Sequence, residues 1–485
     1  MNINLIRKRL QKISQSKKIF LLLLPGIVWI IFNHFFVPFQ VGSELMHRPW
    51  LVVNGEIPYR DFEWIRNPLD IFLIASVFKL FGVYDLSLRL LVFVLYLVIS
   101  LTVFFSIWRK SLVLAATAFY VYVVLLFPLF INTQIGEALV GLFVFLSFTT
   151  FWKYIDTKKE RYIFLAGIFS GLSLVTKQTS IGVLFAIIFT FIVFYIRRGF
   201  VKKLILYSLG VVVPYFFLIL YLIYHNALND YFYYAIYFNL FIYRELAGRW
   251  GFNEGMKMLL LYASSIIPFA FITTPIITRQ IKFLLIMMTI AMIPTLLPSF
   301  WSYRLSSALP LVSLISAVVF LFIFNAIKKN KKSHLVAFSV LSLFIFITFF
   351  SYFWKQYASF IKNYGVSYMP YIYDQTQQDV DTAKWLLKNT PSDVKIFNTA
   401  SNTIMRLANR RHHNKYIDGL PWVYYPYDQT FKEITKVPPE VVVWDSNLTT
   451  NWPELREWKF VPYLHQNYTL KKSIKEIEIY YLNSN

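Results

Sequence analysis

Residues 42–89 read GSELMHRPWLVVNGEIPYRDFEWIRNPLDIFLIASVFKLFGVYDLSLR, and this stretch separates the first two long apolar runs of the chain. It mixes carboxylates, arginines and aromatic residues, whereas the sequence on either side is largely apolar. A polar segment of this length between two apolar runs predicts a large loop at one face of a membrane. We place this loop at residues 38–87 and expect the chemistry of the protein to begin there.

The composition of the whole chain is that of a membrane protein. Its 485 residues are 57% hydrophobic and 20% aromatic, and the mean hydropathy is +0.52, far from the range of soluble domains. The chain has no cysteine, which excludes disulfides, thiolate metal sites and a cysteine nucleophile. The formal net charge of +23 would suit a nucleic-acid binder, but the basic residues gather in alternate loops. We therefore expect contact with anionic membrane lipids and no nucleic-acid partner.

About eleven apolar runs are near the length that crosses about 30 Å of hydrocarbon. They lie at residues 19–37, 88–107, 112–130, 136–153, 162–176, 180–196, 204–224, 257–276, 283–301, 306–327 and 334–353. The run at 69–82 is shorter and carries Asp70 and Lys79. This favours a re-entrant or interfacial helix, with a short span as the alternative. The expected fold is thus an α-helical polytopic membrane protein.

Lysine and arginine predict how the chain is oriented in the membrane. They are concentrated before residue 19 and in every second connection after it, whereas the opposite connections carry few. By the positive-inside rule the N-terminus is cytoplasmic, and an odd number of spans places the C-terminus outside. The N-terminal segment does not resemble a cleaved signal peptide.

The character of the sequence changes after Trp354. Residues 355–485 contain no spanning run; 379–389 has apolar residues at helical spacing, and 394–397, 441–444 and 477–482 read as strands. We therefore divide the chain into a transmembrane module, residues 1–354, and a small extracytoplasmic α/β domain, residues 355–485.

The large loop contains candidate catalytic groups. A carboxylate at the outer boundary of the membrane can act as a general base on an acceptor, and a neighbouring arginine can hold an anionic leaving group such as a phosphate. The alternative is a solvated loop whose charges pair with one another. The candidates are Glu44, Glu56, Asp61 and Glu63 among His47, Arg48, Tyr59, Arg60 and Arg66.

Three isolated ionisable residues are predicted at the outer ends of spans. Lys177 lies in VTKQTS between two apolar runs, Glu137 opens the fourth span, and Arg304 lies near the end of the ninth. Ionisable groups at such positions suggest a functional site, although a lysine can also extend to the headgroups without one. We expect these residues and the large loop to form one polar site.

The connection at 225–257 is rich in tyrosine and phenylalanine and carries Arg244 and Arg249. This composition suits a groove for an isoprenoid chain with arginines at headgroup level, and equally an interfacial helix that anchors the protein. There is no phosphate-binding glycine loop, HExxH pair or dinucleotide-binding glycine motif. We expect no cofactor and predict no metal site, and metal dependence stays open.

At this point the chain resembles the GT-C superfamily of polytopic glycosyltransferases, in particular its protein mannosyltransferase and aminoarabinose transferase branch. The likeness is carried by NGEIPYRDFEWIRNPL (residues 54–69), FKLFG (78–82), SLRLL (87–91) and AGIFSGLSLVTKQTS (166–180). It covers about the first 200 residues and is architectural beyond them. Where the family has an Asp-Glu pair at the start of the loop, this chain has Ser43-Glu44.

The resemblance implies transfer of a sugar from a polyprenyl-phosphate donor to a lipid, glycan or protein acceptor at the outer face, in one inverting displacement. It implies Glu44 as the base, Lys177 and Arg304 on the phosphate, and Arg60 with Asp61 shaping the site. Arg48, Tyr59, Glu137 and Arg244 are the further candidates for substrate binding.

Two other functions stay open at the level of sequence. A lipid or glycan transporter or flippase would also have many spans, but would not need a carboxylate-rich loop and would usually have paired repeats. A non-catalytic, glycan-binding membrane protein is favoured only if Ser43 in place of the family's aspartate means that the chemistry is lost.

Overall fold

The computed structural model describes residues 15–129, 135–196, 199–243, 251–296, 300–329, 334–373, 375–417, 426–451 and 455–483. The chain divides into two compact units. Unit 1 comprises residues 1–39, 89–216 and 249–371, and unit 2 comprises residues 40–88, 217–248 and 372–485.

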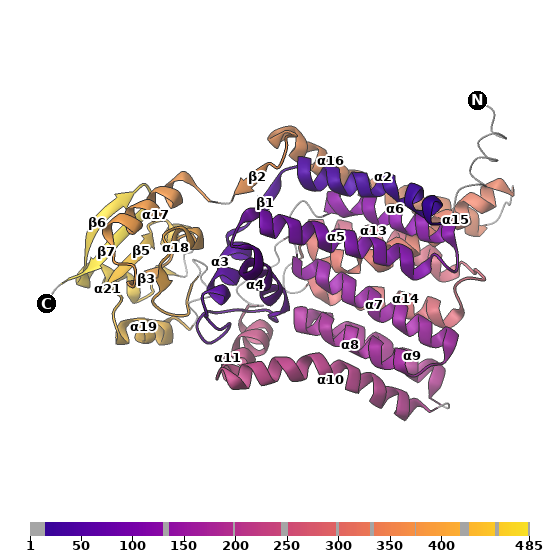
Figure 1. Cartoon of the computed structure of the whole chain (residues 1–485), viewed down its shortest axis with the longest axis horizontal. Coiled ribbons are helices and arrows are strands. Elements are labelled where there is room, and N and C mark those ends of the chain that lie inside the picture. Colours follow the sequence, from indigo (N-terminus) through magenta and orange to yellow (C-terminus); the bar gives the residue numbers. More distant parts are fainter. Residues whose placement is uncertain are drawn as a thin grey trace. The chain divides into compact units, whose positions relative to one another are not determined.

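Unit 1 is built from long apolar helices joined by short connections. In Figure 1, α2, α5, α7 and α8 run roughly parallel to one another. The helices are α2 (Gln15–Phe36), α5 (Asp85–Ile107), α6 (Leu112–Leu129), α7 (Ile135–Thr157), α8 (Arg161–Thr176), α9 (Gly182–Tyr195), α10 (Phe200–Tyr224), α13 (Phe252–Phe271), α14 (Arg279–Ile290), α15 (Leu309–Lys328) and α16 (His334–Tyr364). The first residues of α5 and the last residues of α10 belong to unit 2. Short turns η1 (Gln178–Ile181), η3 (Ile293–Leu296) and η4 (Ser302–Ala308) complete it.

The spans agree with an integral multi-pass membrane protein. Within the described residues, eight helices are long and apolar enough to cross a membrane, and α6 and α8 are shorter apolar helices. The predicted polytopic helical fold is confirmed, and each predicted run overlaps a helix. Helix α13 ends at Phe271 and α14 at Ile290, before the ends of the runs at 257–276 and 283–301. The total of eleven spans is not confirmed. The last helix, α16, continues beyond the predicted run and ends at Tyr364. The next residue, Gly365, adopts φ 78°, which a helix does not accommodate.

Small residues allow the helices of unit 1 to approach closely. In α8, Gly167 and Gly171 form a G-x-x-x-G motif against α10, where Gly210 faces Gly167. A Cβ atom added at Gly167 would lie 2.2 Å from the carbonyl oxygen of Tyr207. Because lipid chains are as apolar as the helices, such close packing is a main source of association in a bilayer.

Arg89, near the start of α5, fastens the end of the first span. Its guanidinium group is fully buried and donates to the carbonyl oxygens of His34 at 2.8 Å, Val37 at 3.2 Å and Pro370 at 3.0 Å. It thereby satisfies carbonyl groups that the C-terminus of α2 leaves unpaired. The arginine of the SLRLL motif therefore sets where the large loop begins.

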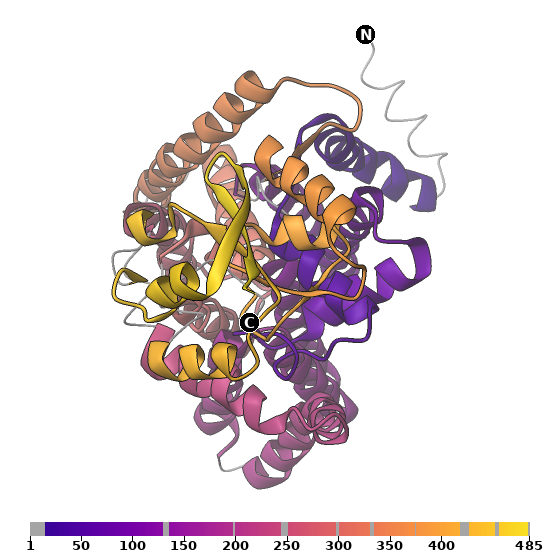
Figure 2. The same ribbon diagram turned by 90° about the vertical axis from the view of Figure 1, so that its left-hand side faces the viewer.

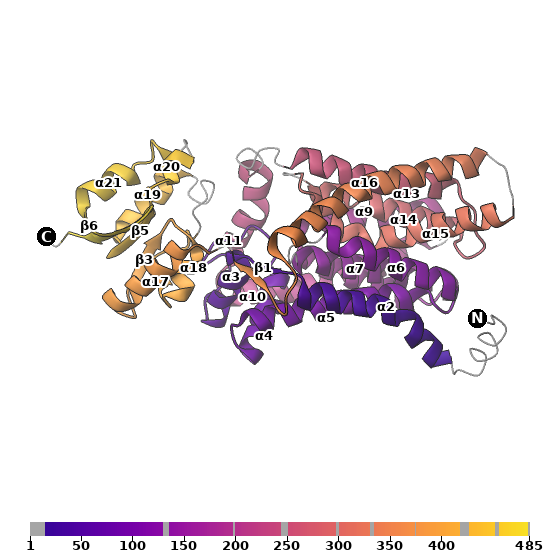
Figure 3. The ribbon, with the colours of Figure 1, turned by 90° about the horizontal axis from the view of Figure 1, so that it is seen from above.

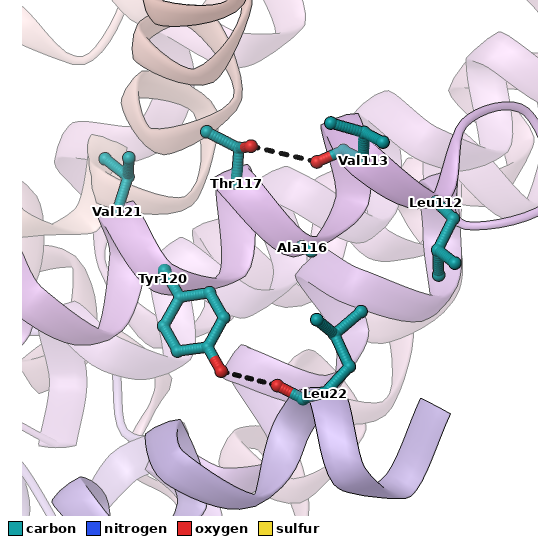
Figure 4. Close-up of a pocket in the computed structure, with 7 residues that line it drawn as sticks. All are labelled: Leu22, Leu112, Val113, Ala116, Thr117, Tyr120 and Val121. Atoms are coloured by element: carbon teal, nitrogen blue, oxygen red, sulfur yellow. Dashed lines mark hydrogen bonds between the residues drawn. The ribbon is translucent and has the colours of Figure 1, made fainter. Parts of the chain in front are cut away.

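An apolar groove of about 430 Å³ lies between α2 and α6. Figure 4 shows Tyr120 of α6 donating its hydroxyl to the carbonyl oxygen of Leu22 of α2 beside it. The seven lining residues include no charged side chain. This groove is therefore a poor candidate for the reaction site.

Unit 2 combines the large loop, part of the tyrosine-rich connection and the C-terminal residues. From the loop come α3 (Ser43–Val53) and α4 (Leu69–Phe81), and from the connection come α11 (Leu228–Tyr231) and the π-helix η2 (Phe232–Ile242). Strands β1 (Phe39–Val41) and β2 (Tyr371–Tyr373) form a two-stranded sheet. The predicted helix at 69–82 is thus present as α4; its interfacial position remains a prediction.

The C-terminal residues form a five-stranded sheet in the order β4-β3-β5-β7-β6. Strands β4 and β5 pair in parallel with β3, and β7 pairs antiparallel with β5 and β6. In Figure 2 the yellow hairpin of β6 and β7 lies at one edge of the sheet. The strands are β3 (Lys395–Asn398), β4 (Arg411–His412), β5 (Val441–Asp445), β6 (Tyr468–Ile474) and β7 (Ile477–Leu482).

Successive side chains of β5 lie on opposite faces of this sheet, and both faces are buried. Val441 and Val443 pack in one apolar cluster with α17 (Gln377–Asn389) and α18 (Asn402–Leu407), and Val442 and Trp444 pack in another with α19 (Tyr427–Lys436) and α21 (Phe460–Asn467). Figure 3 shows these helix pairs on opposite sides of the sheet. The period-two alternation explains why VVVWD forms a central strand. The predicted α/β character of the C-terminal residues is confirmed; the predicted domain boundary at 354/355 stays a prediction.

Candidate functional site

Helix α3 presents the loop carboxylate Glu44 in its first turn. Gly42 precedes the helix with extended backbone, and Asn54 ends it. A carboxylate in the first turn is stabilised by the partial positive charge of the helix N-terminus. The Glu44 side chain is 48% exposed, so it is accessible to a substrate while its helix is anchored in unit 2.

Arg48 connects Glu44 to a second carboxylate. It lies one turn along α3, 3.6 Å from Glu44 and 2.9 Å from Glu63, and its side chain is only 7% exposed. Its guanidinium group also lies 5.0 Å from the ring centre of Trp64, with Arg66 at 5.6 Å from the same ring. Two carboxylates, two guanidinium groups and an indole therefore form one compact polar cluster.

The charges of this cluster determine the ionisation of Glu44. Its dense surroundings alone would raise the pKa of Glu44, but the positive charges of Arg48 and Arg66 outweigh this effect and lower the pKa below its ordinary value. Glu44 is therefore ionised at neutral pH, as a general base must be.

A histidine pair fastens α3 to the C-terminal sheet. His47 of α3 and His412 of β4 meet through their Nε2 atoms at 2.8 Å, and both rings are buried. Burial lowers the pKa of both, that of His412 to about 3, and the neighbouring Arg48 adds to this effect. Both rings are thus neutral at physiological pH, and one can donate its proton to the other.

The PYRDF segment forms a tight turn with its own internal bonds. Tyr59 is fully buried with φ 73°, and its hydroxyl donates to the carbonyl oxygen of Arg66 at 2.6 Å. Arg60 donates hydrogen bonds to both carboxylate oxygens of Asp61, at 2.8 and 2.7 Å. Burial alone would raise the pKa of Asp61, but the bonds from Arg60 and from the Ile57 backbone lower it. The turn therefore presents a rigid, paired carboxylate.

In unit 1, Lys177 and Glu137 form a buried ion pair. Lys177 ends α8 and is 8% exposed; Glu137 opens α7 and is 1% exposed. Charges removed from water are stabilised only when they are paired or bound by a ligand. Lys177 is thus held at a fixed place by α7.

Arg304 lies in η4, which contacts α7. It is 7% exposed, and its carbonyl oxygen accepts hydrogen bonds from Thr295 at 3.1 Å and Ser307 at 3.0 Å. The elements η1 and η3 next to it are also in contact. The two predicted outer cations, Lys177 and Arg304, and the anion Glu137 therefore lie on elements of unit 1 that contact one another.

The structure brings together Glu44 and Arg48 in unit 2, and Lys177 and Glu137 in unit 1. Whether both groups serve one site stays a prediction, as do the individual roles. Arg244 and Arg249 lie outside the described residues. Among those that are described, no group of three or more histidines, aspartates and glutamates could hold a metal ion.

Sequence reasoning missed His412 and the partners of Glu63. The basic and histidine-rich run NRRHHNK at 409–415 was the available signal, because such a cluster within an otherwise mixed domain is unusual. Nothing in the sequence indicated that it would pair with residues more than 300 positions earlier.

Comparisons with known proteins agree with this architecture. Residues 66–224, about a third of the chain, match the family model described as dolichyl-phosphate-mannose-protein mannosyltransferase. The structure is similar to ArnT from Cupriavidus metallidurans bound to undecaprenyl phosphate, with a TM-score of 0.54 and 11% identity over 96% of this chain and 98% of that one. It is also similar to the Archaeoglobus fulgidus oligosaccharyltransferase tethered to an acceptor peptide with an NVT sequon, with a TM-score of 0.50 and 12% identity over 91% and 69% of the two chains. No curated protein matches in sequence.

The match to the family model agrees with the resemblance to GT-C glycosyltransferases that the sequence predicts. The structural likenesses, at 11% and 12% identity, establish the fold alone.

Proposed function

We propose that this protein transfers a sugar from a polyprenyl-phosphate donor to an acceptor at the outer face of the membrane, with inversion at the anomeric carbon. The observation that carries the proposal is Glu44: an accessible carboxylate, kept ionised by Arg48 and Arg66, on the loop that follows the first span. The similarity to a structure bound to undecaprenyl phosphate supports the class of donor.

In the proposed reaction, Glu44 accepts the proton of the acceptor hydroxyl as its oxygen attacks the anomeric carbon. A new carbon–oxygen bond forms there, the bond to the donor phosphate breaks, and the electron pair leaves with the polyprenyl phosphate. Lys177 and Arg304 stabilise the charge that develops on that phosphate. A lipid, glycan or protein can supply the hydroxyl.

The other candidate residues take supporting roles in the proposal. Arg60 with Asp61 shapes the loop, and Arg48 tunes the charge of Glu44. The buried hydroxyl of Tyr59 supports a role in maintaining the turn. Glu137 holds Lys177 in place, and Arg244 is proposed to meet the donor at headgroup level.

The test is a reaction with purified protein in lipid nanodiscs and a panel of polyprenyl-phosphate sugars. Mass spectrometry should detect release of the free polyprenyl phosphate for at least one donor, and release should depend on an added acceptor. Movement of intact donor between leaflets without any release would favour a flippase instead. Binding of glycans without either activity would favour a non-catalytic protein.

A further inference from the structure

We infer that Glu63 is a positioning residue for Glu44, acting by holding Arg48 between the two carboxylates. This inference rests on the proposed function, because it assigns Glu44 the role of base. Arg48 donates to Glu63 at 2.9 Å but lies 3.6 Å from Glu44. The first distance is typical of a strong charge-assisted bond and the second is longer.

The C-terminal residues hold Glu63 in place. Its backbone N–H donates to the carbonyl oxygen of Lys415 at 3.0 Å, and its Oε2 accepts from the backbone N–H of Ile417 at 3.1 Å. Its side chain is only 4% exposed. The segment that follows β4 therefore fixes the position of Glu63. Glu63 in turn fixes Arg48, which lies beside the exposed carboxylate of Glu44 on α3.

The division of Arg48 between two acids has a chemical consequence. A guanidinium group bound fully to Glu44 would occupy the oxygens that must receive the acceptor proton and would make them less basic. The hydrogen bond to Glu63 holds Arg48 at a distance from Glu44. At that distance the positive charge still keeps Glu44 ionised, but the Glu44 oxygens stay available for the acceptor proton. Without the charge of Glu63, Arg48 should close on Glu44.

Other charged groups near this pair must be considered. Arg66 acts directly on Glu44. Arg48 and Arg406 act on His47, and Arg48 also acts on His412; both histidines are neutral because burial lowers the pKa of each. None of these groups supplies a negative charge that could replace Glu63.

The variant Glu63→Gln isolates this effect, because its amide oxygen can still accept from Ile417 while the negative charge is lost. We expect kcat to fall about tenfold or more and the acid limb of the kcat–pH profile to move to lower pH. Donor affinity should stay unchanged. Glu63→Asp, which restores the charge, should recover part of the rate and return the limb towards that of the parent protein.

The control is Glu433→Gln, an exposed acid of α19 whose carboxylate accepts a hydrogen bond from the Tyr416 hydroxyl at 2.5 Å. It should leave the pH profile unchanged. Thermal unfolding of each variant separates positioning from folding. A Glu63→Gln variant with the parent's limb, or with a rate loss that only follows lower stability, would overturn the inference.

Failure of this inference is distinguishable from failure of the proposed function. If Glu44→Gln is inactive while Glu63→Gln keeps the parent profile, only the positioning role is wrong. If Glu44→Gln keeps normal turnover, sugar transfer stands, but Glu44 is not its base and the positioning role of Glu63 fails. If the parent protein releases no polyprenyl phosphate from any donor, the proposed function itself fails.

Discussion

Glu44 and Glu56 lie on the same loop, yet their surroundings shift their pKa values in opposite directions. Around Glu44, two arginines outweigh the desolvation caused by its dense surroundings. Around Glu56, burial and the nearby Asp61 together raise the pKa to about 7, against the weaker effects of Arg411 and Lys395. Carboxylates whose environments separate their pKa values in this way can take different roles at one pH.

Glu56 gives a pH-dependent test of this geometry. The folded state binds the proton of Glu56 more tightly than the unfolded chain does. The carboxyl therefore does not lower the free energy of unfolding below about pH 4.5, and it lowers this free energy increasingly as the pH rises to about 7. Glu56→Gln should therefore unfold at a higher temperature than the parent at pH 8 and at the same temperature at pH 4. An equal shift at both values would point to packing instead of charge.

The ion pair between α7 and α8 gives a prediction at the scale of elements. Removing one partner, in Lys177→Met or Glu137→Gln, leaves a buried charge without its partner and should cost about 3–5 kcal/mol. The double variant should recover most of this stability but not donor use, if Lys177 binds the phosphate. Thermal unfolding and donor affinity should be measured together.

The exposed pair of Lys110 and Asp156 provides the control, since its side chains are 33% and 36% exposed. Lys110→Met should change stability by less than about 1 kcal/mol. A double variant of Lys177 and Glu137 that binds and uses donor like the parent would show that the pair is purely structural.

Helix packing at Gly167 gives a second prediction at this scale. In Gly167→Leu the new Cβ would lie within 2.2 Å of a backbone oxygen of α10, so α8 and α10 would have to separate. We expect this variant to lose its folded, monodisperse form in size-exclusion chromatography. Ile168→Leu, the neighbouring volume-conserving change, should behave like the parent.

The elements could be predicted from sequence far better than the site. Apolar runs and the alternation in VVVWD have a local cause, so the helices and the central strand lie close to where the pattern placed them. The partners of Glu63 and His47 could not be predicted, because Ile417 and His412 follow them by more than 350 positions. Only the fold brings such residues together. The buried position of Tyr59 likewise depends on its left-handed backbone conformation, which the sequence PYRDF does not predict.

At the scale of the whole molecule, the orientation in the membrane remains to be measured. The loop charges predict the C-terminal residues outside and the connection near residue 157 inside. The chain has no cysteine, so single cysteines can be introduced directly. Ser473→Cys should react with a membrane-impermeant maleimide on intact cells, and Thr157→Cys only after permeabilisation. The reverse pattern would place the proposed reaction on the other face.

The central claim is that Glu44 acts as the base in sugar transfer, and Glu44→Gln tests it most directly. The change keeps the size of the side chain and removes its basic oxygen. Transfer rate and donor affinity should be measured side by side on the parent and the variant. The rate is predicted to fall by about 100-fold to 10,000-fold with donor binding little changed. Near-normal turnover would contradict the account and move the base to another carboxylate.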